Sequence, residues 1–262
     1  LIPKLGRLKL DHIEKSVVLN IIDNLIKSDR GVTANRVLQV LKTFLKWCMQ
    51  RGYMDISHIQ SIEKPFKEQS RDRVLSLLEI KKLYESCCIL PSSMRDFTRI
   101  LILSGQRLNE IAKLKWEQLK ESHLEFPREI SKNNKKIITP LTSEMRNIFE
   151  SMSKSGEYIF STTLGIKPLN CFSKIKKRLV YQSHVENWTF HDFRRSMATF
   201  LGDNGIEYKK ILSVLNHSDN SVTAIYNRSL DFKNKLQTLT FWNNSIKMGI
   251  NENNKIHKRL VK

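Results

Sequence analysis

Apolar residues recur at helical spacing through the first fifty positions of the chain, which predicts two amphipathic helices there. An apolar stripe with a period near 3.6 residues is the side that a helix turns towards a core. The stripe of the first predicted helix, over 11–28, consists of Ile13, Val17, Val18, Ile21, Ile22 and Leu25. The stripe of the second, over 34–50, consists of Val37, Leu38, Leu41, Phe44, Leu45 and Cys48.

The apolar periodicity stops between Lys64 and Arg73, where the chain reads KPFKEQSRDR. A new helix start follows at once, because Ser76 with Glu79 three residues later has the form of a capping box. The predicted parts of the chain are a helical domain over 1–65, a linker over 66–73, a larger domain over 74–242 and a flexible or partner-docked tail over 243–262.

The pattern of the larger domain predicts mainly helices with a small antiparallel β-sheet. Helical spacing covers 92–103, a stretch beginning at Arg107, and nearly all of the chain from Leu169 to the tail. Strand-like residues lie within 123–141, at LEF and at KIITPL, and the KNN between them predicts a tight turn. The residues YIF at 158–160 predict one more short strand.

The chain is strongly basic, since its 262 residues include 45 Lys and Arg against 26 Asp and Glu, a formal net charge of +19. Lysines and arginines displace the counterions condensed on nucleic acid. A solvated basic surface or an acidic membrane face is the alternative. The chain has no lipid motif and no basic amphipathic anchor, and no apolar run approaches the roughly 18 residues of a membrane span. We therefore expect nucleic acid as the partner and no membrane. The candidate phosphate contacts, for which a solvated face is the alternative, are Arg36, Lys42, Lys46 and Arg51.

A zinc site has no support in the sequence. The four cysteines, Cys48, Cys87, Cys88 and Cys171, do not form the two CxxC pairs that structural zinc sites commonly use. The chain also has no Gly-rich phosphate loop.

The stretch from His191 to Tyr226 gathers side chains suited to chemistry at a phosphate. His191 and Arg194 are three residues apart, so on a helix they share a face and can reach one ligand, whereas Arg195 points elsewhere. His217 precedes Ser-Asp-Asn, which should cap a helix running to Tyr226. Tyrosine can form a covalent intermediate through oxygen, although a single tyrosine is more often a packing residue.

Two further candidates lie earlier in the larger domain. Arg107 follows a small-residue turn, and Glu110 one helical turn later could orient its guanidinium. Lys132 lies on the predicted hairpin tip, where a solvated charge is the ordinary alternative. A long ammonium on a β-turn is nevertheless suited to protonate a leaving oxygen.

Together these motifs resemble the tyrosine recombinases of the phage-integrase superfamily, most closely the integrases of prophages and genomic islands. The resemblance covers about residues 4–230. The similar segments are SGQRLNEIAKLKW (first arginine motif), SKNNKKIITPL (catalytic-lysine hairpin), HDFRRSMAT (His-x-x-Arg motif) and VLNHSDNSVTAIYNRSL (final histidine and tyrosine). Six functional positions in matching order and spacing are far more specific than any single motif.

The resemblance implies site-specific DNA cleavage and rejoining through a 3′-phosphotyrosyl intermediate, with no metal or nucleotide cofactor. The implied roles are phosphate binding for Arg107 and Arg194, a hydrogen bond to phosphate for His217, proton transfer at the tyrosine for His191, protonation of the leaving 5′-oxygen for Lys132 and nucleophilic attack for Tyr226. Two residues depart from the family pattern. Asn216 stands where many members have Gly, and Gln106 replaces a commoner apolar residue.

The resemblance also implies that residues 1–65 form a core-binding domain and that an arm-binding domain precedes Leu1. It implies a homotetramer on two double-stranded DNA sites, with accessory DNA-bending proteins as further candidate partners, in the cytoplasm and associated with the nucleoid. Phe241 and Trp242 could then dock on a neighbouring protomer or pack within their own domain.

Two other classes stay open: a type IB topoisomerase, which relaxes supercoils by the same chemistry, and a non-catalytic DNA-binding protein in which these residues serve packing. Among recombinases, the sequence does not separate an integrase from a chromosome-dimer resolvase or a transposon recombinase.

Overall fold

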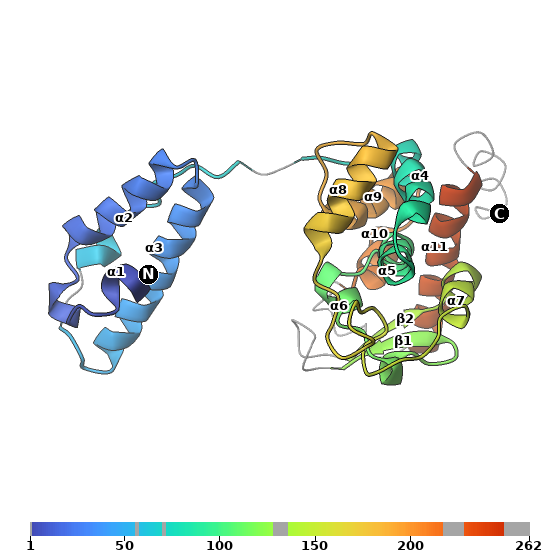
Figure 1. The fold of residues 1–262 in the computed structure, drawn as a ribbon, viewed down its shortest axis with the longest axis horizontal. Coiled ribbons are helices and arrows are strands. Elements are labelled where there is room, and N and C mark those ends of the chain that lie inside the picture. Colours follow the sequence, from blue (N-terminus) through green and yellow to red (C-terminus); the bar gives the residue numbers. More distant parts are fainter. Residues whose placement is uncertain (1, 56–57, 70–71, 128–135, 217–227, 249–262) are drawn as a thin grey trace. The chain divides into compact units, whose positions relative to one another are not determined.

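The computed structural model describes residues 2–55, 58–69, 72–127, 136–216 and 228–248. The chain divides into two compact units, Leu1–Asp72 (unit 1) and Arg73–Lys262 (unit 2) (Figure 1). None of the helices in the described ranges combines the length and the apolar character that a membrane crossing requires.

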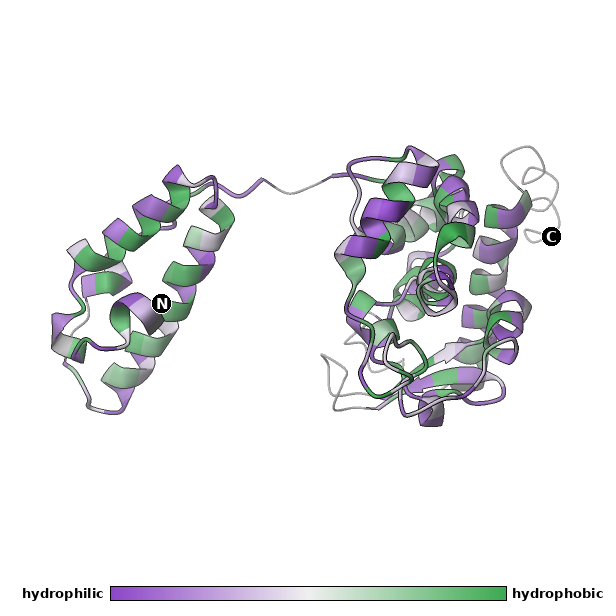
Figure 2. Cartoon of the chain, in the orientation of Figure 1, coloured by the Kyte–Doolittle hydropathy of each residue, from purple (hydrophilic) through white to green (hydrophobic). Residues whose placement is uncertain are grey.

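Unit 1 is built on two long helices, α2 (Lys15–Lys27) and α3 (Gly31–Gln50), which pack against each other. Each of them carries both hydrophobic and hydrophilic turns (Figure 2). The short elements are α1 (Ile2–Leu5), η1 (Leu10–His12) and η2 (His58–Ser61). The core of unit 1 consists of Leu5, Val18, Ile22, Ala34, Leu38, Leu41, Leu45, Ile59 and Ile62.

Both predicted helices of unit 1 are present, with corrected ends and one corrected core position. The first begins at Lys15 because the 3₁₀ turn η1 takes up the residues before it, and the second begins at Gly31. Phe44, expected in the apolar stripe, is 45% exposed, because the core side of α3 follows Leu41, Leu45 and Cys48 instead.

The segment predicted to be a linker begins inside unit 1. The Asn35 side chain donates to the Phe66 carbonyl oxygen at 2.7 Å and to Glu68 Oε1 at 2.8 Å, and it accepts from the Phe66 main-chain N at 3.2 Å. Gly31 faces the Phe66 ring, which lies only 2.2 Å from the place a Cβ would take. Residues 66–68 are therefore fastened to α3, and the predicted linker start at 66 is wrong.

Unit 2 is mainly helical with one two-stranded antiparallel sheet, which confirms the predicted fold class. Strands β1 (His123–Phe126) and β2 (Ile137–Pro140) pair in the register His123 with Pro140 and Phe126 with Ile137. Tyr158 makes only an isolated bridge with Lys115, so the short strand predicted at 158–160 is wrong. The helices are α4 (Leu77–Ser86), α5 (Ser92–Ser104), α6 (Leu108–Ala112), α7 (Ser143–Glu150), α8 (Phe172–Ser183), α9 (Phe190–Asp203), α10 (Tyr208–Val214) and α11 (Arg228–Met248), with the 3₁₀ turns η3 (Cys87–Ile89) and η4 (Trp116–Gln118).

Local signals explain where α4 starts and why α5 lies inside. The predicted capping box is present: Ser76 Oγ accepts from the Glu79 N, and Glu79 Oε2 accepts from the Ser76 N at 2.9 Å. Helix α5 lies at the centre of unit 2 (Figure 1), and most of its residues are buried, including Phe97 and Ile100 at 0% exposure. Residues 100–103 of α5 are a continuous apolar run, and a helix segment without a polar side is expected to lie inside a core.

The predicted tail begins too early. Helix α11 continues past 243 to Met248, and Asn243, Ser245 and Ile246 are buried. Trp242 is fully buried and donates from its indole Nε1 to the Ile102 carbonyl oxygen at 2.9 Å. Of the two alternatives for the aromatic pair Phe241 and Trp242, packing within its own domain is the one that the structure contains.

Candidate active site

Arg107 is placed by a glycine turn and held by an acid. Helix α5 ends at Gly105, whose φ of +60° lies in the left-handed region, and a Cβ there would lie 2.4 Å from the Met197 Sδ. Arg107 then takes extended geometry at the N-cap of α6. Glu110 Oε1 accepts from Arg107 Nη1 at 2.8 Å, and its Oε2 accepts from the Arg107 main-chain N at 3.0 Å. The orienting contact expected between these two residues is therefore present.

Arg194 joins two segments that are distant in sequence. It lies buried on α9, and its guanidinium donates to the Gly105 carbonyl oxygen at 2.9 Å and to the Leu215 carbonyl oxygen. One of these segments leads into Arg107 and the other follows α10. Arg195 instead pairs with Asp192 at 3.3 Å, a structural contact as expected.

The first turn of α9 brings His191 into the same electrostatic environment. The pKa of Arg194 is lowered to about 10, mainly because the guanidinium is buried and next because Arg107 is positive nearby. His191 is exposed, but partial desolvation lowers the pKa of its imidazole, and the charges of Arg194 and Arg195 lower it further. The structure thus brings Arg107, His191 and Arg194 together, and the positive charges of this group favour the binding of an anion.

Three predicted site residues, Lys132, His217 and Tyr226, lie outside the described residues. Their sequence neighbours are described: β1 and β2 flank the segment that contains Lys132, Asn216 precedes His217, and α11 begins at Arg228. No group of three His, Cys, Asp or Glu side chains in the described part of the chain is arranged to hold a metal ion.

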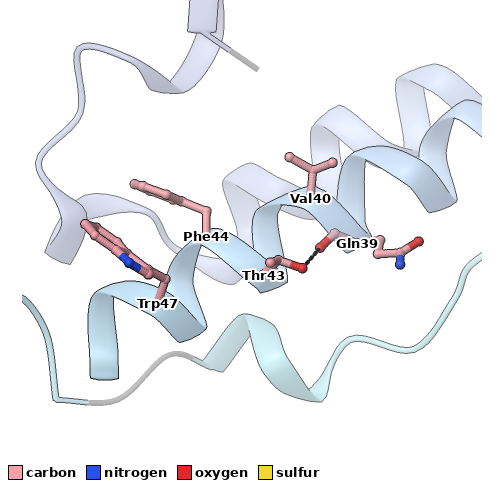
Figure 3. Close-up of a pocket in the computed structure, with 5 residues that line it drawn as sticks. All are labelled: Gln39, Val40, Thr43, Phe44 and Trp47. Atoms are coloured by element: carbon pink, nitrogen blue, oxygen red, sulfur yellow. Dashed lines mark hydrogen bonds between the residues drawn. The ribbon is translucent and has the colours of Figure 1, made fainter. Parts of the chain in front are cut away.

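The candidate phosphate contacts of unit 1 differ in what they touch. Arg36 is exposed, with Nη2 4.0 Å from the Glu68 carboxylate, and Lys46 is exposed. Lys42 is half-buried and donates from Nζ to the Gln60 carbonyl oxygen at 2.8 Å, so its ammonium serves the fold of unit 1. The Arg51 guanidinium lies 5.8 Å from the centre of the Trp47 ring. The exposed side of α3 also forms a shallow pocket lined by Gln39, Val40, Thr43, Phe44 and Trp47 (Figure 3).

Some contacts of the site have no local signal in the sequence. The two carbonyl oxygens that bind Arg194 belong to Gly105 and Leu215, which lie 89 and 21 residues away along the chain. A carbonyl oxygen is present at every residue, so only the fold can select these two.

Comparison with known proteins identifies the class. The model of the phage integrase family matches residues 73–232. The tyrosine recombinase XerD of Listeria innocua serovar 6a is 31% identical over 218 residues, which cover 76% of this chain and 72% of the relative.

Solved structures agree on the fold. A lambda integrase(75-356) dimer bound to a COC′ core site matches with a TM-score of 0.65 and 20% identity over 86% of each chain. A lambda integrase tetramer bound to a Holliday junction matches with a TM-score of 0.64 and 20% identity over 81% of this chain and 66% of that chain.

The family match and the similarity to XerD together show that the chain is a site-specific recombinase of the tyrosine class. It belongs to the phage integrase family.

Proposed function

We propose that this chain cleaves and rejoins strands of double-stranded DNA through a 3′-phosphotyrosyl intermediate on Tyr226. The observation that carries the proposal is the group formed by Arg107, Arg194 and His191, assembled from α6 and α9. Its arginines are the phosphate-binding pair of the proposed site.

Arg107 and Arg194 bind the two non-bridging oxygens of the scissile phosphate. The lowered pKa of Arg194 means that its buried positive charge has too little negative charge near it in the free protein. A bound phosphate supplies that negative charge. Both guanidiniums are already fixed, one by Glu110 and the other by two carbonyl oxygens. Preorganised cations of this kind stabilise the charge that builds up in the transition state.

The proton transfers fall to three other residues. The Tyr226 hydroxyl oxygen attacks phosphorus and loses its proton with the help of His191, whose imidazole pKa is lowered in the free protein, which favours its proton-accepting form. The bond to the 5′-oxygen breaks, and Lys132 donates a proton to that oxygen. His217 donates a hydrogen bond to the phosphate. No metal or nucleotide is needed, because the phosphotyrosine retains the energy of the broken bond.

The proposed partners are two DNA recombination sites held by a homotetramer in the cytoplasm, with accessory DNA-bending proteins at some sites. Support comes from the net charge of +19 and from the DNA-bound dimer and tetramer of lambda integrase named above. In this proposal unit 1 is the core-binding domain, and its exposed Arg36 and Lys46 contact backbone phosphates.

Covalent capture tests the proposal and selects the target sequence in the same experiment. A library of duplexes with randomised half-sites carries a nick a few nucleotides downstream of the cleavage position, so that the short 5′-hydroxyl strand dissociates and the adduct is trapped. We expect a denaturation-resistant adduct whose DNA converges on one sequence, and none with Tyr226→Phe. Binding of a consensus sequence without an adduct would instead indicate a non-catalytic DNA-binding protein.

A relaxation assay separates the topoisomerase alternative. Supercoiled plasmids with and without the captured sequence are incubated with the parent chain, and recombinant products are scored on the same gel. We expect recombination only between plasmids that carry the captured sequence. Rapid relaxation of both plasmids without recombination would assign the chain to the type IB topoisomerases.

The role of Lys132 has its own test. Lys132→Ala should cleave slowly on ordinary DNA and near the parent rate on DNA with a 5′-bridging sulfur, because a thiolate leaves without a proton. Equal defects on both substrates would exclude Lys132 as the general acid.

A further inference from the structure

Gln106 and Asn216, the two residues that depart from the family pattern, are hydrogen-bonded to each other. Asn216 Nδ2 donates to Gln106 Oε1 at 2.6 Å. Gln106 is 2% exposed, and its Nε2 donates to the carbonyl oxygens of Ser104 and Val214, both at 3.0 Å. Gln106 directly precedes Arg107, and Asn216 directly precedes His217.

The Gln106 side chain adds two connections, to the Val214 carbonyl oxygen and to Asn216, between segments that Arg194 already joins. The Arg194 guanidinium links the Gly105 and Leu215 carbonyl oxygens, and one residue further along each segment the Gln106 side chain meets that of Asn216. Adjacent cross-links at different residues constrain both the separation and the tilt of the segments, whereas a single cross-link would leave the segments free to rotate about it.

The backbone at Asn216 explains why an amide side chain can occupy this place. Its φ is +51°, in the left-handed region that glycine and asparagine adopt most readily. The main-chain N of Asn216 donates to the Ser213 carbonyl oxygen at 3.0 Å, which closes the turn after α10. Asparagine thus keeps the backbone that the family's glycine would allow and adds a side chain that binds Gln106.

Lys235 extends the contact to two further elements. Its side chain is 12% exposed, and Nζ lies 3.4 Å from Asn216 Oδ1, 3.2 Å from the Ile138 carbonyl oxygen on β2 and 3.3 Å from Asp231 Oδ2 on α11. Helix α11 packs along β2 (Figure 1). One ammonium therefore joins the strand that follows the Lys132 hairpin, the turn before His217 and the helix that follows Tyr226.

We propose that Gln106, Asn216 and Lys235, here called the polar chain, are positioning residues that hold together four segments: the one leading into Arg107, strand β2, the turn before His217, and helix α11. The polar chain acts through the backbone directly before Arg107 and His217, and through the strand and the helix that follow Lys132 and Tyr226 along the chain. The inference rests on the proposed function.

The energetics of a buried hydrogen-bonded pair give a specific expectation. Removing one partner leaves a buried polar atom without a bond, whereas replacing both partners by apolar groups can be nearly neutral. Gln106→Leu and Asn216→Gly should therefore each disturb the site. The double variant, which restores the commoner family pattern at both positions, should recover most of the rate, because only the Ser104 and Val214 carbonyl oxygens then lack their donor.

The test compares the parent, the two single variants and the double variant on the captured DNA sequence. We expect each single variant to lower the rate of adduct formation at saturating DNA by about tenfold, with the Kd for DNA within about twofold of the parent. The double variant should return to within about threefold of the parent. A loss of folding alone would change the active fraction and not the rate per active molecule, which titration with trapped DNA measures.

Lys235→Met tests the third member against a matched lysine. Lys210 lies on α10 in an exposed pair with Glu207 at 3.1 Å, so Lys210→Met should leave the adduct rate unchanged. Lys235→Met should lower the rate at saturating DNA with an unchanged Kd and an unchanged salt dependence of binding. A weaker Kd with a shallower salt slope would instead make Lys235 a DNA-phosphate contact.

Each outcome decides the inference. Single variants that form adduct like the parent, or a double variant no better than the worse single variant, would overturn it while the proposed function stands. A parent chain that forms no adduct would overturn the proposed function and this inference together.

Discussion

Replacing Glu110 with Gln tests how the structure orients Arg107. The carboxylate accepts from Arg107 Nη1 at 2.8 Å and from the Arg107 main-chain N at 3.0 Å. Glutamine keeps a carbonyl oxygen for the main-chain bond, but it loses the negative charge, and its amide nitrogen cannot accept from a guanidinium. The helix cap should therefore survive while the orientation of the Arg107 side chain is lost.

The magnitude follows from the exposure of the pair. Hydrogen bonds to charged groups contribute about 1.5–3 kcal/mol. The Glu110 side chain is 7% exposed but that of Arg107 is 32% exposed, so solvent screening favours the low end of that range. We expect the unfolding free energy to fall by about 1.5 kcal/mol. The adduct rate should fall about tenfold, because a guanidinium that is no longer fixed stabilises the transition state less.

Urea unfolding and adduct formation at saturating DNA measure the two effects. Glu85→Gln is the matched control, since Glu85 is 62% exposed and pairs with Lys81 at 4.0 Å, and it should change neither quantity appreciably. In an Arg107→Gln background, Glu110→Gln should cost less than about twofold, because the acid acts through Arg107. A further tenfold loss in that background would refute the reasoning.

Three further predictions concern His191, unit 1 and α11. In the free protein the NMR titration midpoint of His191 should lie below its ordinary value of 6.5, and binding of DNA should raise it by supplying negative charge beside Arg194. Because the unfolded chain takes up this proton first, the group's contribution to stability should fall as the pH drops below 6.5. Asn35→Ala should lower the unfolding free energy of unit 1 by roughly 2 kcal/mol, since its bonds to Phe66 are lost. Trp242→Phe should lower the unfolding free energy of unit 2 by about 2–3 kcal/mol, because the smaller ring leaves a cavity and the hydrogen bond to Ile102 is lost.

A control variant or a contradicting result accompanies each of these three predictions. A His191 midpoint at or above 6.5 would contradict the electrostatic account of the site. Asn24→Ala removes an exposed bond to Asn20 and should be nearly neutral; equal losses at Asn24 and Asn35 would deny Asn35 a special role. Trp47→Phe alters a tryptophan that is 47% exposed and should cost far less than the change at Trp242.

Features with a local cause could be predicted from the sequence. The capping box of Ser76 and Glu79 and the pair of Arg107 and Glu110 each join residues three apart, so their spacing alone indicates the contact. The apolar period likewise indicates α3, although it misplaces Phe44, because an aromatic residue at the edge of a stripe can be left exposed.

Features that depend on residues far apart along the chain could not be predicted from the sequence. Helix α11 buries polar side chains, among them Asn243, whose Nδ2 bonds Thr142 101 residues earlier, so its end has the sequence of a polar tail. Gln106 and Asn216 each depart from the family pattern, but their contact spans 110 residues and only the fold places them together. Lys235 has no distinguishing signal at all in a chain with 45 basic residues.

Peptide mapping of the trapped adduct tests the central claim most directly. Trypsin releases residues 211–228 as one peptide, ILSVLNHSDNSVTAIYNR, in which Tyr226 is the sole tyrosine. After nuclease digestion of the trapped DNA, this peptide should carry the mass of a nucleotide phosphate on Tyr226. A nucleotide found on any other residue, or an adduct formed equally well by Tyr226→Phe, would contradict the account.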